Sequence, residues 1–197
     1  MEPKRSVHRN ETLGGYYLLF IGFVIGMILP NLMYKMEWKQ DMAAALYLMG
    51  IYAEESGMDY FWKVIRMRGG IWLLAAGSGL TIFGVPIAVG GLIIFGMQTA
   101  MLLTMSILQF GLYGGVVGAG LLFPQIIAYL PCVLAASGII YESSIQIWKN
   151  RSFLPGQISA YILKMALCTA GFVVGILLET YCNPVITRIL IRNLKIF

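Results

Sequence analysis

The amino-acid sequence predicts an all-α fold: a polytopic membrane helical bundle of about five transmembrane helices plus interfacial amphipathic helices. From Gly69 to Tyr141 the chain has 73 residues without one Asp, Glu, Lys, Arg or His. As a helix this run would be about 110 Å long, enough to cross a hydrocarbon core of about 30 Å roughly three times. The whole chain is 59% hydrophobic and only 12% charged, whereas soluble domains contain about 25% charged residues. These observations predict one integral membrane domain over residues 1–197.

The first predicted span covers about residues 13–34. Its 22 uncharged residues exceed the apolar region of a signal peptide, and no small-x-small cleavage motif follows, so we expect a retained helix. Residues 35–68 carry five basic and five acidic residues. The apolar patch at residues 42–53 is too short to span as a helix, which favours a position at the membrane surface. Residues 61–68 mix aromatic and basic side chains and are predicted to form an amphipathic elbow at the interface.

Glycines and prolines divide the uncharged run into further spans. A second span is expected at about 70–83, followed by a tight turn at residues 84–86. A third span is expected at about 86–110, because Pro86 suits the first turn of a helix. Residues 111–115 contain three glycines and are predicted to form a brief uncharged loop.

The fourth and fifth spans are expected at about 116–141 and 158–181. Pro124 and Pro131 lie in the fourth span, and each removes a backbone hydrogen-bond donor, so this helix is predicted to be kinked or broken. The tail at residues 185–197 is predicted to form a basic amphipathic helix on the membrane surface. Its basic face consists of Arg188, Arg192 and Lys195. Membrane lipid rather than nucleic acid is the expected partner of the basic residues, because they lie in short segments between apolar runs.

Small residues on a helix surface allow close packing, which matters in lipid because burial of apolar surface does not drive helices together there. Three glycine pairs have the GxxxG spacing: Gly22 and Gly26, Gly114 and Gly118, and Gly171 and Gly175. We interpret them first as grooves for packing within the chain. The same grooves would also fit the transmembrane helix of a partner or a second copy of this chain.

Two charged residues, Lys164 and Glu179, interrupt the fifth span. Lys164 lies within one or two turns of the span boundary and can extend its ammonium group to the interface. Glu179 has a shorter side chain among apolar neighbours, so we expect it to have a partner or to be held protonated. Two interpretations stay open: a structural ion pair or interfacial position, and a functional relay or partner contact.

The residues give no pattern typical of catalysis, of a cofactor or of a metal site. His8 is the only histidine and lies in the polar N-terminal tail, so the serines of the spans have no histidine base. The chain also lacks a Walker A motif. Cys132, Cys168 and Cys182 lack CxxC spacing and are interpreted as small apolar packing residues. We therefore expect a protein without enzymatic activity.

Four separated segments follow one another along the chain: YFWKVIRMRGGIWLL, GLTIFGVPIAVGGLIIFGMQTAM, FPQIIAYLP and LLETYCNPVITRIL. In this order and spacing they resemble the stage II sporulation protein M family of endospore-forming bacteria. The resemblance covers roughly residues 13–197 and implies five spans with the same loop order. Each segment alone is mostly apolar, so their order carries the resemblance.

The resemblance also marks candidate functional residues. A proline followed by His or Gln lies in the fourth span of the family, which corresponds to Pro124 and Gln125. Relatives often carry Pro-His-Gly there, from which the Pro-Gln-Ile of this chain departs. A glutamate before an Asn-Pro-like stretch closes the last span, which corresponds to Glu179, Asn183 and Pro184.

The resemblance implies a noncatalytic, multi-pass anchor in the bacterial cell membrane, at the sporulation septum and the engulfing mother-cell membrane. Its implied partners are stage II sporulation proteins D and P, which degrade peptidoglycan outside the membrane. Lys4, Arg5 and Arg9 precede the first span and favour a cytoplasmic N-terminus, which would turn the first loop toward these enzymes. A count over all loops favours the opposite orientation, because the first loop and the tail together hold eight basic residues, against five in the N-terminus and the fourth connection.

Two other functions stay open. A permease subunit of a transporter driven by a separate ATPase would use the interrupted fourth span and Glu179, since transporters build their sites from broken helices. A lipid-binding protein would use the basic tail at residues 185–197 instead.

Overall fold

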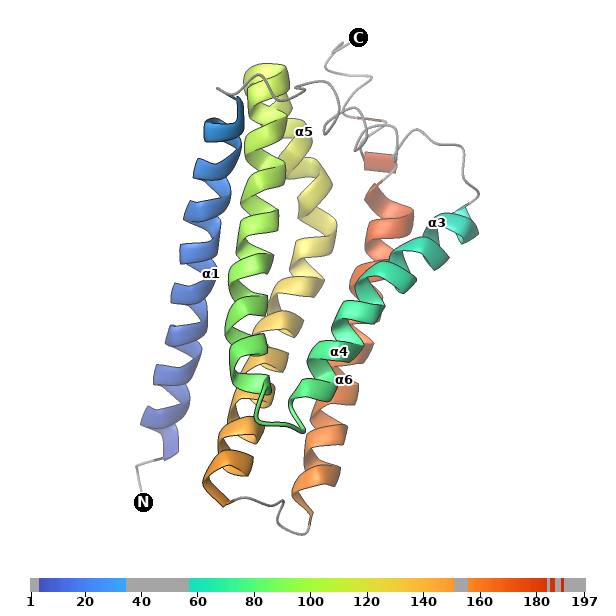
Figure 1. Ribbon diagram of the computed structural model, residues 1–197. Helices are drawn as coiled ribbons and strands as arrows, with labels where there is room; N and C mark the ends of the chain where they lie inside the picture. The colour runs from blue at the N-terminus through green and yellow to red at the C-terminus, as the bar shows by residue number, and fades with distance from the viewer. Residues whose placement is uncertain (1–3, 35–56, 151–155, 184, 187–188, 190–197) are drawn as a thin grey trace.

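The computed structural model of this chain describes residues 4–34, 57–150, 156–183, 185–186 and 189. All secondary structure in these ranges is helical, which confirms the predicted all-α fold (Figure 1). The elements are α1 (Lys4–Tyr34), α3 (Gly57–Val64), η1 (Ile65–Gly69), α4 (Gly70–Ser78), α5 (Gly84–Asn150), α6 (Gln157–Leu177) and η2 (Leu178–Cys182). The two η elements are π-helical turns that continue the α-helices beside them.

Four stretches of the described helices are long and apolar enough to cross a membrane. They are Gly14–Leu32, Gly84–Leu108, Leu122–Lys149 and Gln157–Cys182. The chain is therefore a membrane protein of the all-α polytopic class. The second span predicted from the sequence, at about 70–83, is not among these four stretches.

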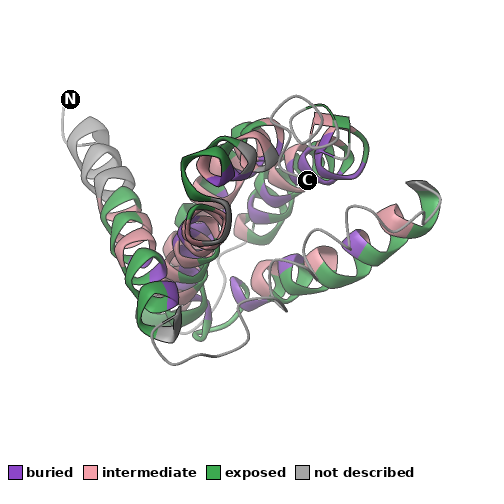
Figure 2. Ribbon diagram, turned by 90° about the horizontal axis from the view of Figure 1, so that it is seen from above, coloured by how far each residue is buried: buried purple, intermediate pink, exposed green. Residues whose placement is uncertain are grey.

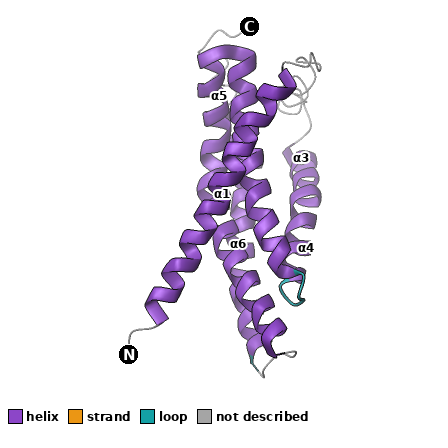
Figure 3. Ribbon diagram, turned by 60° about the vertical axis from the view of Figure 1, so that its left-hand side comes forward, coloured by secondary structure: helices purple, strands orange, loops and turns teal. Residues whose placement is uncertain are grey.

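The segments predicted as an elbow and a second span form one continuous helix of α3, η1 and α4, and we call residues 57–78 the arm. The first part of the arm carries Asp59, Lys63, Arg66 and Arg68, so only its last part is apolar. The arm runs along the bundle beside α6 instead of lying across its end (Figures 1 and 3). It is thus a fifth, partly charged helix of the bundle.

The arm ends in a turn at residues 79–83, shortly before the position predicted for it (Figure 3). The backbone N–H of Thr81 donates to the carbonyl of Ser78 at 2.9 Å, which closes the end of the helix. Gly84 then begins α5 and is buried; a Cβ there would lie 2.0 Å from Oγ of Ser144. Gly84 is therefore a packing residue, because its missing side chain lets the start of α5 touch its far end.

α5 is a helical hairpin that reverses direction at Gly111 (Figure 1). Gly111 has a φ of 64° and a ψ of −148°, a backbone conformation that favours glycine because a Cβ would be strained there. We call residues 84–110 the first limb of α5 and residues 112–150 its second limb. The loop predicted at 111–115 is reduced to this one residue.

Pro124 and Pro131 do not break the second limb. Every residue of α5 except Gly111 keeps helical backbone dihedrals, so of the two outcomes predicted at these prolines, a kink or a break, the break does not occur. Proline is tolerated within membrane helices because neighbouring helices and small local adjustments satisfy the freed backbone groups.

α1 packs on the first limb of α5 through glycines on both helices. A Cβ at Gly22 would lie 2.1 Å from the carbonyl oxygen of Ile93, and a Cβ at Gly26 would lie 2.3 Å from that of Met97. On the facing side, a Cβ at Gly96 would lie 2.3 Å from a carbonyl oxygen of α1. The two backbones therefore touch, which is how helices associate in lipid without a hydrophobic driving force.

α5 is the central element of the bundle. Seen from above, α1 lies on one side of α5, while α6 and the arm lie on the other (Figure 2). Buried residues follow the facing sides of these helices, and large apolar side chains are exposed on their outer sides. This distribution suits a lipid solvent, in which an outer apolar surface is not penalised.

The contact between α1 and α5 makes a prediction for Gly22→Ala. The added methyl group would collide with a backbone carbonyl that cannot rotate away, so we expect the free energy of unfolding to fall by about 1–3 kcal/mol. Denaturant unfolding in detergent measures this change. Gly14→Ala is the matched control, because a Cβ at Gly14 meets no atom within 4 Å. An equal effect of the two substitutions would contradict the packing described here.

Candidate functional site

A charged contact joins the arm to the end of α6. Nη2 of Arg68 lies 2.6 Å from Oε1 of Glu179, and the Tyr129 hydroxyl donates to Oε2 of Glu179 at 2.8 Å. Both oxygens of the Glu179 carboxylate therefore accept a hydrogen bond. The guanidinium carbon of Arg68 also lies 5.4 Å from the centre of the Tyr129 ring, within the range of a cation–π contact. We call Arg68, Tyr129 and Glu179 the ion-pair cluster.

Because Glu179 is buried, its carboxylate needs partners within the protein in place of water. The Glu179 side chain is 9% exposed, whereas the Arg68 side chain is 39% exposed. Glu179 lies about 14 Å from the centre of its span, which places the carboxylate near the edge of the hydrocarbon core. A carboxylate without a partner at this depth would be costly. The structure thus shows an ion pair at Glu179, one of the two interpretations left open by the sequence.

The backbone around the ion-pair cluster is unusual on both sides. Arg68 lies in η1 and Glu179 lies in η2, so both charged partners project from π-helical turns. Such turns inside α-helices are rare and occur frequently at functional sites. The extra residue in each turn changes which side chains face the neighbouring helix, and here it presents Arg68 and Glu179 to one another.

Gly175 makes room for the third member of the cluster. A Cβ at Gly175 would lie 2.5 Å from the ring of Tyr129. Its predicted partner in helix packing, Gly171, has the same role one turn earlier, where a Cβ would lie 2.5 Å from Sγ of Cys132. The pair therefore seats the second limb of α5 against α6 and lets the Tyr129 hydroxyl reach Glu179.

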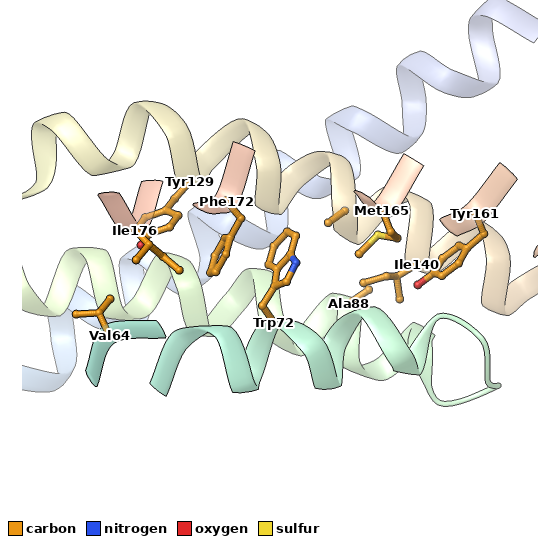
Figure 4. Close-up of a cluster of buried hydrophobic side chains, with 10 residues drawn as sticks. Val64, Trp72, Ala88, Tyr129, Ile140, Tyr161, Met165, Phe172 and Ile176 are labelled. Carbon is orange, nitrogen blue, oxygen red and sulfur yellow. The ribbon is translucent and has the colours of Figure 1, made fainter. Parts of the chain in front are cut away.

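Aromatic side chains continue from Tyr129 along the contact between the arm and α6 (Figure 4). The rings of Trp72 and Phe172 stack with centres 4.2 Å apart, and the Tyr129 ring lies 4.9 Å from that of Phe172. Nε1 of Trp72 donates to Oγ1 of Thr169 at 2.9 Å. Further along, the Tyr161 hydroxyl donates to a carbonyl of α4. We call these aromatic contacts the aromatic seam; it joins the arm to α6 over most of its length.

Two residues marked by the family resemblance, Gln125 and Asn183, are buried near the ion-pair cluster. Gln125 precedes Tyr129 by one turn of the second limb, and Asn183 follows Glu179 by four residues. Because the second limb and α6 run in opposite directions, both residues lie beyond the Tyr129–Glu179 contact toward the same end of the bundle (Figure 1). We call Gln125, Glu179 and Asn183 the buried polar layer, because all three are polar and buried.

The remaining candidates lie elsewhere. Pro124 is partly buried and Pro131 is exposed, so they do not share one environment. Gly114 and Gly118 are buried in the hairpin, where a Cβ at Gly118 would lie 3.0 Å from Ser106 of the first limb. Four candidates fall outside the described residues: Pro184, Arg188, Arg192 and Lys195.

Sequence reasoning missed three residues of this site: Arg68, Tyr129 and Trp72. Arg68 looked like one of several basic residues of an interfacial elbow, and Tyr129 and Trp72 looked like ordinary aromatic residues of the spans. The available signal was the need of Glu179 for a cation. Its partner lies 111 residues earlier in the chain, a separation that no local pattern reveals.

The arrangement is suited to fastening helices together. The Glu179 carboxylate is held by a cation from the arm and a hydroxyl from the second limb of α5. Among the described residues, no three His, Cys, Asp or Glu side chains lie together as a metal site would require. Comparison with known proteins identifies no relative: no family model, no curated protein and no solved structure matches this chain.

The ion-pair cluster predicts energetic coupling between Arg68 and Glu179. We expect Arg68→Gln or Glu179→Gln alone to lower the free energy of unfolding by about 1–3 kcal/mol, because each leaves a charge without its partner. The double variant should lose less than the sum, by about 1 kcal/mol, since it removes both charges; exposure of Arg68 to solvent limits the size of this coupling. Denaturant titration in detergent measures the free energy of unfolding of the two single variants and of the double variant.

Arg66 provides the control for this cycle. It is exposed on the arm, two residues from Arg68, and makes no ion pair with the described residues. Arg66→Gln combined with Glu179→Gln should therefore be additive within about 0.5 kcal/mol. Additivity of the Arg68 and Glu179 substitutions as well would show that their contact contributes nothing specific to stability.

Proposed function

We propose that this chain is a noncatalytic membrane scaffold that holds peptidoglycan-degrading partners at the septum during engulfment in endospore formation. The resemblance to the stage II sporulation protein M family supports this role and supplies the candidate partners, stage II sporulation proteins D and P. The structural observation that supports it best is the engagement of Glu179. Its carboxylate ties the arm to α6 and α5, as expected of a protein whose buried charge maintains a shape.

The shape itself suits a platform. α1 is fixed to α5 by backbone contacts at Gly22 and Gly26, and the arm is fixed to α6 by the ion-pair cluster and the aromatic seam. Two independent kinds of contact thus hold the outer helices on the central hairpin. A protein that positions others benefits from outer surfaces that keep one arrangement.

The proposal includes an orientation with the N-terminus in the cytoplasm. α1 then leaves the membrane on the outer side after Tyr34, and the arm enters from that side at Gly57. The helix of α6 and η2 ends at the same end of the bundle (Figure 1), and the buried polar layer lies near that helix end. In this orientation that end faces the compartment in which wall-degrading partners act.

Co-purification tests the scaffold proposal. The full chain in detergent should co-elute with stage II sporulation protein D or P on size-exclusion chromatography. Gly22→Ala, if it dislodges α1 from α5, should reduce co-elution, whereas Gly14→Ala should leave it unchanged. Persistent separation of the wild-type chain from both partners, with every protein folded, would contradict the proposal.

A permease subunit is the second candidate, and the buried polar layer is the observation that favours it. Gln125 and Glu179 are polar, buried and on neighbouring helices, as residues of a transport site would be. The broken fourth helix that also supported a permease does not occur, because α5 stays helical through Pro124. A scaffold therefore accounts for more of the structure.

Access of water separates the two candidates. In a chain whose native cysteines are replaced by alanine, we expect Gln125→Cys to stay unreactive toward a membrane-impermeant maleimide added to either side of sealed vesicles. An exposed position on the arm, Trp62→Cys, is the reactive control. Labelling of Gln125→Cys from both sides would show a water-filled route and would favour the permease.

A further inference from the structure

The first limb of α5 presents a polar side chain to the lipid. Gln98 lies two residues, or about 3 Å, from the centre of the span Gly84–Leu108. Its side chain is exposed and makes no hydrogen bond with the described residues. A glutamine side chain cannot extend to a membrane boundary about 15 Å away. Its amide, with two donors and an acceptor, therefore faces acyl chains that offer no hydrogen-bond partner.

Hydroxyl side chains in the membrane spans, unlike Gln98, do have hydrogen-bond partners. Thr99, Ser106 and Thr169 donate to carbonyls one turn earlier in their own helices, at 2.9, 2.9 and 2.8 Å. This backbone bond is the usual way for Ser and Thr to be satisfied inside a helix. Gln98 has no such bond, so a partner for it has to come from outside the described residues.

Gln98 belongs to an exposed stripe on one face of the first limb. Ile87, Gly91, Ile94 and Gln98 are all exposed and follow one another at intervals of four, three and four residues, the spacing of one helix face. A Cβ at Gly91 would meet no atom within 4 Å, so another helix backbone has room to approach closely. We call these four residues the Gln98 face.

Other faces of the first limb are already occupied. α1 contacts Ile93 and Met97, and Ser106 faces the second limb at Gly118. The Gln98 face is separate from both contacts and also from the ion-pair cluster. It is an apolar surface with one hydrogen-bonding group near the middle of the membrane.

We propose that the Gln98 face is the interface of a homodimer with its twofold axis along the membrane normal. In a twofold interface each residue near the axis meets its own counterpart. Two glutamine amides satisfy one another because each is both donor and acceptor, whereas identical charged groups would repel. This self-complementarity identifies a second copy of the chain as the occupant, and Gly91 allows the two helices to approach.

The dimer goes beyond the scaffold function and does not depend on it. No residue of the Gln98 face belongs to the ion-pair cluster or the aromatic seam. A dimer formed by the pure chain in liposomes would therefore stand even if stage II sporulation proteins D and P failed to bind. For a scaffold, two copies would present two sets of partner sites, which strengthens binding of linked partners.

Cysteine crosslinking of the full chain in liposomes tests the dimer. With the native cysteines replaced by alanine, Ile94→Cys places a thiol on the Gln98 face one turn before Gln98. Oxidation should convert the chain with Ile94→Cys to a disulfide-linked dimer. Ile162→Cys is the control, because Ile162 on α6 is 55% exposed and Ile94 is 50% exposed. It should give only the slow background of random collisions.

The second readout is energy transfer between labelled copies of the chain, measured at increasing lipid dilution. It compares the wild-type chain with variants of the Gln98 face. Gln98→Leu suits lipid and should weaken the dimer about tenfold, equivalent to about 1.4 kcal/mol for the lost amide hydrogen bonds. Gly91→Leu should weaken it further by blocking close approach. Gly138→Leu is the matched control and should have no effect, because Gly138 is an equally open glycine on the second limb.

Thermal unfolding of each variant shows whether the chain is folded. Absence of crosslinking through Ile94→Cys in a folded chain would overturn the proposal. A dimer whose strength is unchanged by both Gln98→Leu and Gly91→Leu would overturn it as well, because the two copies would then meet through another surface.

Discussion

A carboxylate at the edge of the hydrocarbon layer must be neutralised where it lies, and the arrangement of the arm, α5 and α6 follows from this constraint. Glu179 gathers Arg68 from the arm and Tyr129 from the second limb of α5 around one point. In lipid, apolar contacts between helices compete with equally apolar acyl chains, so they specify little by themselves. The ion pair fixes the position of the arm along α6 and its rotation about its own axis. The aromatic seam then fills the space between the two helices.

The other side of the bundle is held by a different interaction. α1 and the first limb of α5 approach until backbone carbonyls meet glycines, at Gly22 and Gly26 on one helix and at Gly96 on the other. This contact needs no charge, because its strength comes from many short van der Waals contacts. The two outer helices are therefore attached by different contacts, and we expect a change on one side to leave the other side intact.

Hydropathy was enough to predict the helical class and the approximate places of four membrane spans, because only long apolar helices satisfy their backbone groups in lipid. Local signals were less reliable at the ends of the helices. The glycines and proline at residues 84–86 predicted a turn, but Gly84 is glycine because Ser144 packs against it. Pro124 and Pro131 predicted a kinked or broken helix, but the helix is not broken there, since no water in lipid competes for the remaining backbone hydrogen bonds.

The candidate site could be predicted only in part. Glu179 was recognisable because a charge in an apolar span needs an explanation. Arg68 was not recognisable as its partner, since three nearby basic residues of the arm look alike in the sequence. Which of them turns inward depends on the π-helical turn η1, and hydrophobic periodicity assumes the regular α-helical repeat that such a turn interrupts. Tyr129 depends in turn on the space left by Gly175.

The reversal of α5 at Gly111 bears on how the protein is made. The two limbs are joined without any polar stretch that could remain in water while one limb waits for the other. An apolar second limb emerging from the ribosome has no favourable place outside the bilayer, so we expect the two limbs to enter it together. Because α1 and the arm precede the hairpin in the chain, the hairpin would enter as one unit beside helices that are already made, and α6 would be added last.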